Sequence, residues 1–184
     1  MIEFTSHSEV QQIRMSRYPD FPAATWVCAY LIDGLLIDTG PAYTAQELTA
    51  AMAGRNLKLA VNTHYHEDHI SANKFLQDAC GIEIYAHPLA IARINSSAKL
   101  YPYQEDVWGY PVPSVVKPVG SYVETEHNRF EVVPTPGHDR DHICLFEPEQ
   151  GWLFCADAYI GGQDRSARAD YDIYTIISSL KTLA

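Results

Sequence analysis

Short apolar runs alternate along the chain with segments whose apolar residues recur at helical spacing, and this order predicts an α/β fold. The strongest local signal is Asp33-Gly34, a dipeptide typical of two-residue hairpin turns, which separates two apolar runs. Gly81 follows an amphipathic stretch and predicts the end of a helix. The predicted strands are 26–32, 35–37, 57–62, 82–86, 129–133, 143–146 and 152–155. The predicted helices are 43–53, 71–80, 88–97 and 171–180.

The segment 99–118 breaks this order. Its aromatic residues, among them Tyr101 and Trp108, are interleaved with four prolines, so we expect neither a regular helix nor a central strand there. A loop of this length inside a compact domain is more often functional than idle. Two interpretations stay open: a wall of a substrate pocket, or an aromatic flap that packs on the core or on another subunit.

The six residues from His64 to His69 carry the clearest chemical signal in the chain. They hold three histidines together with Glu67 and Asp68, directly after a predicted strand. Neutral imidazole and carboxylate are the ligands that Zn²⁺ prefers. A solvated, histidine-rich turn is the alternative, and it would be the better interpretation for any single histidine. The combined spacing predicts a metal site.

Three further segments, together with this one, resemble the metallo-β-lactamase-fold hydrolase superfamily, which includes glyoxalase II, lactonases, phosphodiesterases and flavodiiron proteins. The sequence His-Tyr-His-Glu-Asp-His at 64–69 resembles the ligand loop of that family. The segments Leu-Ile-Asp-Thr-Gly at 36–40, Pro-Thr-Pro-Gly-His at 134–138 and Phe-Cys-Ala-Asp at 154–157 follow the family's order. The resemblance implies a metallo-β-lactamase-like αββα sandwich, forming one domain over 1–184 and shortened at its C-terminal end.

The resemblance also implies the metal ligands. They would be His64, His66 and His138 around a first ion, Asp68 and His69 at a second ion, and Asp157 as a bridge between the two. Zinc is expected, as one or two ions, with iron or manganese as alternatives. Asp68 is the catalytic candidate, which would orient the nucleophile or accept its proton. Asp38 is expected to support the loop, and His142 to brace it, without binding metal.

One departure from the family affects the second ion. Family members with a full dinuclear site supply another histidine after the bridging aspartate, whereas this sequence has no histidine beyond His142. We therefore expect the second ion to be held less firmly than the first. The sequence leaves three explanations open: a naturally short chain, a piece of a longer protein, or completion by another subunit.

Composition limits the possible binding partners and locations of the protein. The chain of 184 residues has 13 Lys+Arg against 23 Asp+Glu and a formal net charge of −10, which disfavours a nucleic-acid substrate because such binding depends on basic side chains. No signal sequence is recognisable, and no apolar run approaches the roughly 20 residues of a spanning helix, so no membrane role is expected. Four widely spaced cysteines without a C-x-x-C pair favour a reducing cytoplasm.

Two functions from different classes fit these observations. The first is a metal-dependent hydrolase that uses an activated water on a small ester, thioester, lactone or related small-molecule substrate. The second is a catalytically weak or inactive member of the fold that serves as a metal-binding interaction module. A homodimer is expected in either case, because the apolar face of 171–180 and the aromatic segment around Tyr101 and Tyr110 offer sticky surfaces.

Overall fold

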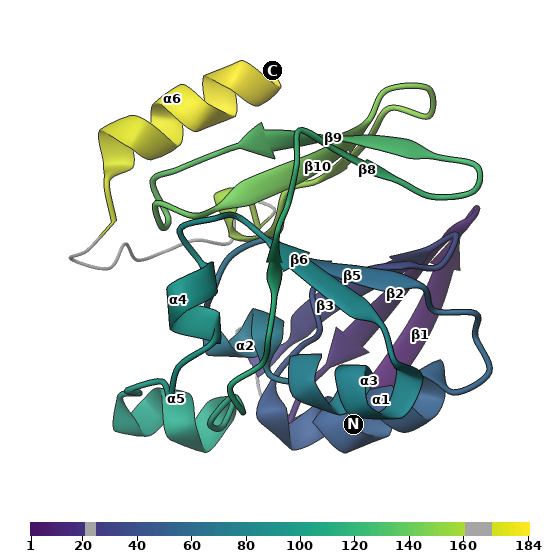
Figure 1. Cartoon of the computed structure of the whole chain (residues 1–184). Helices are drawn as coiled ribbons and strands as arrows, with labels where there is room; N and C mark the ends of the chain where they lie inside the picture. The colour runs from purple at the N-terminus through teal and green to yellow at the C-terminus, as the bar shows by residue number, and fades with distance from the viewer. Residues whose placement is uncertain (21–24, 161–170) are drawn as a thin grey trace.

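Two β-sheets packed face to face form the centre of the molecule, and helices cover their outer faces (Figure 1). The structure is a computed structural model that describes residues 1–20, 25–160 and 171–184. The first sheet has the order β1 (Ile2–His7), β2 (Val10–Met15), β3 (Val27–Ile32), β4 (Leu35–Ile37), β5 (Leu59–Asn62), β6 (Glu83–Ala86) and β7 (Lys117–Pro118). The second sheet has the order β11 (Trp152–Phe154), β10 (Ile143–Glu147), β9 (Arg129–Pro134) and β8 (Tyr122–Glu124).

Helices lie over the outer face of each sheet, and short helices lie in the connections between strands (Figure 1). Two helices cover the outer face of the first sheet: α1 (Ala45–Met52), which follows the short 3-10 helix η2 (Ala42–Thr44), and α3 (Asn73–Cys80). One helix, α6 (Ile173–Leu183), lies over the second sheet. The others are α2 (Glu67–Ile70), α4 (Ile91–Ile94), α5 (Pro102–Val107) and the 3-10 helix η3 (Ala156–Ala158). The result is an αββα sandwich, as the sequence predicted.

The change from antiparallel to parallel pairing in the first sheet positions the chemistry. Strands β1 to β4 pair antiparallel, whereas β4, β5, β6 and β7 pair parallel. Ile37 lies opposite Val61, so β4 and β5 end side by side. Asp38 and the histidine loop follow these two ends directly. Loops at the same edge of a sheet can bring distant side chains together on a rigid scaffold.

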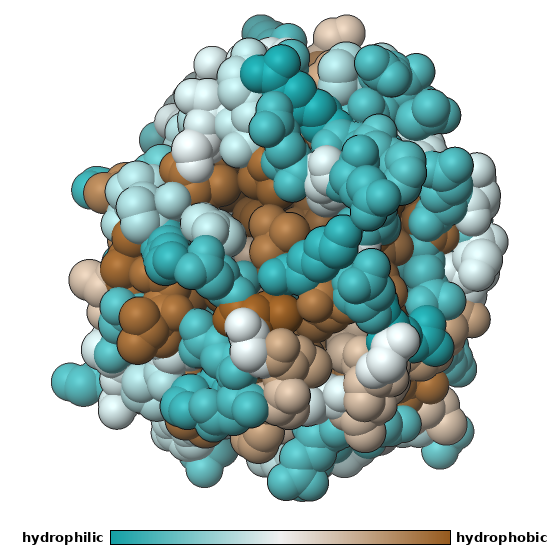
Figure 2. Space-filling model, turned by 45° about the vertical axis from the view of Figure 1, so that its right-hand side comes forward, coloured by the Kyte–Doolittle hydropathy of each residue, from teal (hydrophilic) through white to brown (hydrophobic). Residues whose placement is uncertain are grey.

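Two apolar cores hold the layers together. Between the sheets, Phe130 and Leu145 from the second sheet pack with Leu35 and Ile37 from the first, and all four are nearly inaccessible to solvent. The other core lies between the first sheet and its covering helices. Figure 2 shows apolar residues gathered in a band across the middle of one face, with hydrophilic residues around it. Burial of the apolar side chains in these two cores, at roughly 25 cal/mol per Å², is the main favourable contribution to folding.

Helix α6 is attached to the second half of the molecule by few contacts. Its Ser179 hydroxyl donates a hydrogen bond of 2.7 Å to the carbonyl of Pro136, and the N–H of its N-cap residue Asp172 donates one of 3.0 Å to the carbonyl of Gly137. Ile173 and Ile177, which the helical pattern assigned to one apolar face, are 46% and 45% exposed. The helix thus covers the sheet while part of its apolar side faces solvent.

The prediction for 99–118 was wrong in part. Residues Pro102–Val107 form helix α5, because proline fits the first turn of a helix, where its missing N–H is not needed. The Gln104 side chain accepts a hydrogen bond of 2.8 Å from the Tyr101 N–H and completes the helix start. Lys117–Pro118 forms β7 at the edge of the first sheet, a position that tolerates proline. The aromatic segment is therefore helical in part, and residues 109–116 between α5 and β7 have no regular secondary structure.

Other differences concern boundaries and short strands. The hairpin β1–β2 was not predicted, although Val10, Ile13 and Met15 are buried. Strand β8 was also missed, and the helix predicted over 88–97 shortens to Ile91–Ile94. Gly81 does end α3, with a φ of 67° in the left-handed region. No helix among the described residues is long and apolar enough to cross a membrane.

Candidate metal centre

Three loops bring the candidate ligands together at the ends of strands from both sheets. The loop after β5 carries His64 and His66 and continues into α2, which contains Asp68 and His69. The loops after β9 and β11 supply His138 and Asp157, the second of these within η3. Both halves of the sandwich therefore contribute ligand-type side chains, and the six candidates named from the sequence lie together.

A first group consists of three imidazoles and one carboxylate. One ligand atom from each of four residues lies within 4.8 Å of all the others, and these residues are His64, His66, His138 and Asp157. His138 Nε2 is 3.1 Å from His66 Nδ1 and 3.3 Å from Asp157 Oδ2. All three histidines are buried, so water competes little for their lone pairs. The arrangement matches the nitrogen and oxygen donors that a divalent metal ion prefers.

A second, smaller group shares Asp157 with the first. The Oδ1 atom of Asp157 is 3.4 Å from His69 Nε2, while its Oδ2 atom faces His138. Asp68 Oδ2 lies 3.5 Å from the same His69 nitrogen. Asp157 thus directs one oxygen to each group, which is the geometry a bridging carboxylate needs. Among the described residues, this second group contains one imidazole and two carboxylates.

Asp38 fixes the orientation of the loop from behind. Its Oδ1 atom accepts a hydrogen bond of 2.8 Å from Thr63 N, and its Oδ2 atom accepts one of 2.8 Å from Thr63 Oγ1. His69 Nδ1 lies 2.8 Å from Oδ2, so the ring donates its Nδ1 proton to the carboxylate. His69 Nε2 then faces Asp68 and Asp157. The structure therefore gives Asp38 the supporting position that the sequence predicted.

The same contacts set the tautomer of His64. Thr63 uses its hydroxyl hydrogen toward Asp38, so its oxygen is left to accept from His64 Nδ1, 3.1 Å away. This places the His64 proton on Nδ1 and leaves the Nε2 lone pair directed into the site. That Nε2 atom is buried and has no hydrogen-bond partner among the described residues. A buried nitrogen without a partner is costly, and a metal ion would satisfy it.

His66 is held by a carboxylate that the sequence did not single out. Its Nδ1 faces His138, while its Nε2 lies 3.8 Å from Asp139 Oδ2. The same Asp139 oxygen lies 3.4 Å from Nη1 of Arg93, whose guanidinium is stacked 4.1 Å from the centroid of the Tyr65 ring. Carboxylates behind ligating histidines orient the ring and raise its basicity.

Burial and neighbouring charges give the histidines of the site different pKa values. Burial lowers the pKa of His64 well below its usual value and that of His138 to about 4. Burial alone would also lower the pKa of His69, but its carboxylate neighbours, led by Asp68, raise it well above the usual value. Asp157 is desolvated too, yet the adjacent His69 keeps its pKa below the usual range. In the metal-free protein near pH 7, His64 and His138 are therefore neutral, Asp157 is ionised and His69 is protonated.

His142, Tyr159 and His87 lie outside the two groups. His142 packs beside them, with its ring centroid 5.1 Å from that of His64, and its Nδ1 lies 2.8 Å from Thr135 Oγ1. Its Nε2 is buried without a partner among the described residues. Tyr159 is 58% exposed. His87 Nδ1 accepts a hydrogen bond of 3.2 Å from Leu89 N.

A further set of ligand-type side chains, Asp33, Glu126 and His127, lies near the surface. Both oxygens of Asp33 are engaged by His127, one by its backbone N–H at 2.7 Å and one by its ring Nδ1 at 3.2 Å. The Glu126 carboxylate forms an ion pair with Lys58. These contacts tie two turns together and leave few free lone pairs for a metal ion.

Sequence reasoning missed Asp139, Arg93 and Tyr171 at this site. Asp139 follows His138 directly, which is the one signal in the sequence that could have suggested it. Arg93 lies 46 residues earlier and reaches the site only through the fold. The Tyr171 ring is 4.8 Å from the His138 ring and closes one side of the first group.

The sequence is similar to those of several known proteins. The sequence profile described as the metallo-beta-lactamase superfamily matches residues 28–183. A hydroxyacylglutathione hydrolase of Thermosynechococcus vestitus is 32% identical over 112 residues, which is 61% of this chain and 38% of that protein. A probable metallo-hydrolase of Bacillus subtilis is 29% identical over 145 residues, or 78% of this chain and 64% of that one.

Solved structures agree on the fold. A metallo-beta-lactamase from Pontibacter korlensis superimposes with a TM-score of 0.73 at 20% identity, over 100% of this chain and 85% of that one. At this identity the likeness concerns the fold alone. The chain spans less than two thirds of the length of the curated relatives named above.

We predict that the two metal positions respond differently to pH. His64 and His138 are already neutral near pH 7, because burial holds their pKa values low, so a metal ion entering the first group displaces no proton from them. His69 must lose a proton, so affinity at the second position should rise about tenfold per pH unit. Calorimetric zinc titrations from pH 6 to 8, in buffers of different ionisation enthalpy, measure the affinity and the number of protons released at each position. Equal pH slopes for the two positions would contradict this assignment.

A second prediction concerns Asp139. Asp139→Asn keeps the shape of the side chain but removes the charge that faces His66 Nε2 and Arg93. We expect the first metal ion to bind roughly 10- to 100-fold more weakly, which is the usual effect of losing a partner behind a ligand. Asp78→Asn is the matched control, because Asp78 lies on the exposed side of α3 and pairs with Lys74. Unchanged affinity in Asp139→Asn would show that His66 needs no such support.

Proposed function

The chain belongs to the metallo-beta-lactamase superfamily, and from that premise we propose that it is a metal-dependent hydrolase of small esters, thioesters, lactones or related compounds. The observation that supports this most directly is the pair of ligand groups that share Asp157. Its two oxygens face His138 and His69, so two ions could lie on either side of one carboxylate. Such a pair suits hydrolysis better than a purely structural site, which would be closed by four protein ligands.

The residues present fit this role. Bound dications acidify water and polarise a carbonyl oxygen. His64, His66 and His138 would hold the first ion with Asp157, while Asp68 and His69 would hold the second. Water adds to the acyl carbon, the bond to oxygen or sulfur breaks, and the products are a carboxylic acid and an alcohol or thiol. Asp68, whose side chain is 15% exposed, is placed to accept or orient the water proton.

Thioesters are the first substrates to test. Several of the relatives that this chain resembles are named hydroxyacylglutathione hydrolases, although the chain covers only 38% of the length of the one from Thermosynechococcus vestitus. We propose zinc as the metal, with iron or manganese as alternatives, because imidazole and carboxylate donors suit all three. One firmly held ion and one weaker ion are expected, since the second group has fewer imidazoles.

The second candidate function is a metal-binding interaction module with little or no activity. It is supported by the small second group, in which Asp68, His69 and Asp157 are the described ligand-type side chains. Metal content measured together with a hydrolysis panel separates the two functions. A module would retain the first ion and hydrolyse none of the esters, thioesters or lactones.

We predict distinct effects for ligand and proton-acceptor variants. His64→Ala and His138→Ala should each lose the first ion and all hydrolysis, because each removes a buried donor atom. Asp68→Asn should keep the first ion, yet lower kcat by roughly 10²- to 10⁴-fold, the usual contribution of a positioned acid or base. Metal analysis and thioester kinetics on the same preparations provide the readouts, with Asp78→Asn as a control.

Two outcomes would contradict these assignments. Full metal content in His64→Ala and His138→Ala would remove the first group as the metal site. Full activity in Asp68→Asn would exclude Asp68 from proton transfer. In that case the nucleophile would need no protein carboxylate at this position.

We also propose a homodimer, and we propose a cytoplasmic location from the four unpaired cysteines. Two sets of exposed side chains support self-association. One set is Ile173, Tyr174 and Ile177 on α6, and the other is Tyr101 and Tyr103 at the start of α5. Sedimentation at micromolar concentration should give twice the mass of one chain, and Ile173→Glu with Ile177→Glu should shift it to the monomer if α6 is the interface. A wild-type monomer at that concentration would rule the dimer out.

A further inference from the structure

A cavity of about 250 Å³ opens beside the candidate metal centre. It lies among α2, α4 and α5, and it includes His66 and Glu67 from the metal loop itself. Its other walls include Arg93, Lys99, Leu100 and Tyr101. A molecule bound at His66 could therefore extend directly into this cavity.

The cavity carries positive charge in a protein that is otherwise acidic. Arg93 and Lys99 are its cationic side chains, whereas the whole chain has a formal net charge of −10. The one lining carboxylate, Glu67, is only 5% exposed and presents little of its surface to an incoming ligand. Within the described part of the chain, no carboxylate forms an ion pair with Lys99. Both cationic side chains are exposed.

Arg93 is held in place before any ligand arrives. Its guanidinium is stacked on the Tyr65 ring at 4.1 Å, and its Nη1 atom lies 3.4 Å from Asp139 Oδ2. The other N–H groups of the fork have no partner among the described residues and stay open to a second acceptor. A planar guanidinium fixed in this way binds carboxylates with two parallel hydrogen bonds and loses little rotamer freedom on doing so.

The remaining walls suit a short hydrocarbon chain. Ile70, Leu100 and Pro111 are apolar, and Tyr65 and Tyr101 supply aromatic surface. The volume is below the roughly 300 to 1,000 Å³ of sites for drug-sized ligands, so a fragment of a few carbon atoms fits better than a whole large ligand. A small, partly apolar cavity with two cations favours a ligand that carries a negative charge a short distance from its reacting carbonyl.

We propose that Arg93 and Lys99 form an anion-binding subsite, and that the natural substrate is an acyl ester or thioester with a carboxylate a few bonds from the scissile carbonyl. This inference rests on the proposed hydrolase function. The carboxylate pairs with Arg93 and Lys99 while the carbonyl lies at the metal centre near His66. The subsite sets KM and selectivity, and it takes no part in breaking the acyl bond.

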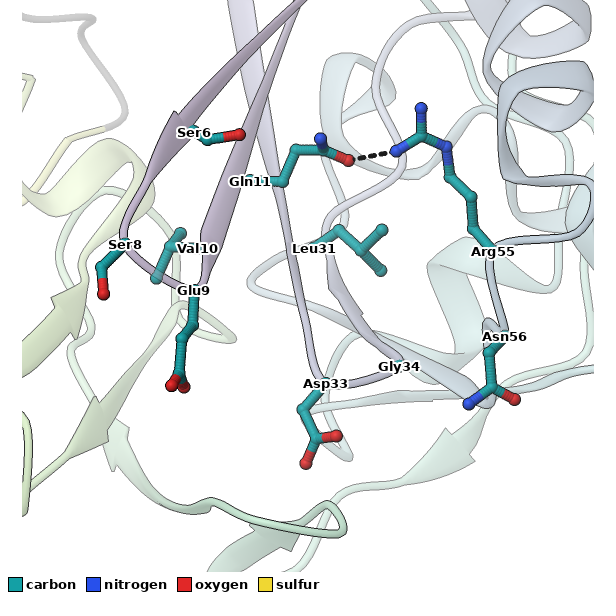
Figure 3. A pocket seen from close by; sticks show the side chains of 10 residues that line it. All are labelled: Ser6, Ser8, Glu9, Val10, Gln11, Leu31, Asp33, Gly34, Arg55 and Asn56. Carbon is teal, nitrogen blue, oxygen red and sulfur yellow. Dashed lines mark hydrogen bonds between the residues drawn. The ribbon is translucent and has the colours of Figure 1, made fainter.

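A further cavity, of about 370 Å³, does not compete for this role. It lies beside the turn at Asp33 and Gly34 (Figure 3), at the opposite end of β4 from the metal loop. Its Arg55 already bonds to the side chain of Gln11, as Figure 3 shows, and is stacked at 4.7 Å on Phe4. Neither the candidate ligands nor a free cation in the described part of the chain faces it.

Two matched substrate pairs test the proposal on the metal-loaded protein. The first pair is the acetyl thioester of 3-mercaptopropanoate and that of 3-mercaptopropanamide, which differ in charge on the thiol side. The second pair is a succinyl and a succinamoyl thioester of one neutral thiol, which differ in charge on the acyl side. In one of the pairs, we expect kcat/KM to favour the charged member by about 10- to 100-fold, as hydrogen bonds to charged groups do. The preference should weaken as salt is raised.

Variants then assign that preference to the two cations. In Arg93→Gln and Lys99→Gln, the ratio of kcat/KM between charged and neutral members should fall toward one through KM, and Arg93→Lys should restore part of it. Lys74→Gln, on the exposed side of α3, is the matched control and should keep the full ratio. Metal content measured for each variant separates loss of the subsite from loss of an ion, because Arg93 also contacts Asp139.

A binding measurement keeps the subsite testable without turnover. Succinate, but not succinamide, should shift the side-chain NMR signal of the Arg93 Nε–H group, and Lys99→Gln should weaken that binding. Equal rates for charged and neutral members of both pairs, or a preference that survives both glutamine variants, would overturn the subsite while leaving the hydrolase intact. No hydrolysis of any ester, thioester or lactone would overturn the proposed function, and the succinate titration would still decide the subsite.

Discussion

The carboxylate of Asp38 is the interaction on which the rest of the site depends. It follows β4 directly and is 3% exposed. It accepts hydrogen bonds from Thr63 N and Thr63 Oγ1 at 2.8 Å and contacts His69 at the same distance. Its φ of 60° lies in the left-handed region, which aspartate enters more readily than most residues. This strained, buried position persists because its partners are all in place.

These contacts explain why His64 and His69 both turn their Nε2 atoms to the same space. Asp38 acts on His69 directly and on His64 through the Thr63 hydroxyl, so one carboxylate decides two tautomers. The backbone adds to this, because Asp38 N donates to Val61 O at 2.9 Å and ties the loop to the end of β5. A buried charge that loses a partner typically costs about 3–5 kcal/mol. The site is thus supported by the same interactions that connect β4 to β5.

Local and distant features of the site differ in how far the sequence predicts them. The spacing of His64, His66 and His69 identifies a ligand loop without any structure, because the loop is continuous in the sequence. The place of His138 and Asp157 followed only from resemblance, since 72 residues separate His66 from His138. The contact between Arg93 and Asp139 was not predictable, because it joins a helix beside the first sheet to a loop of the second.

The fold shows the same division. Glycine at the end of α3 and the Asp33-Gly34 hairpin act within a few residues, and both were predicted. Helix α5 was missed because proline was treated as a helix breaker, although Pro102 occupies the one turn where it is favourable. The hairpin β1–β2 has no strong turn signal of the kind at Asp33. Its burial depends on pairing with β3, which a local pattern does not contain.

The candidate metal centre takes its ligands from loops of both sheets, which has a consequence for stability. His64 and His69 belong to the first sheet's loops, whereas His138 and Asp157 follow strands of the second. Without metal, His64 Nε2 is a buried atom without a described partner, and each such atom costs about 1–3 kcal/mol. An ion held by ligands from both sheets removes this cost and joins the two halves of the sandwich. Because the unfolded chain offers no assembled site, the binding free energy adds to the free energy of unfolding. A metal ion bound by these histidines would therefore stabilise the protein relative to its metal-free form, and it would link the ion energetically to the packing of the two sheets.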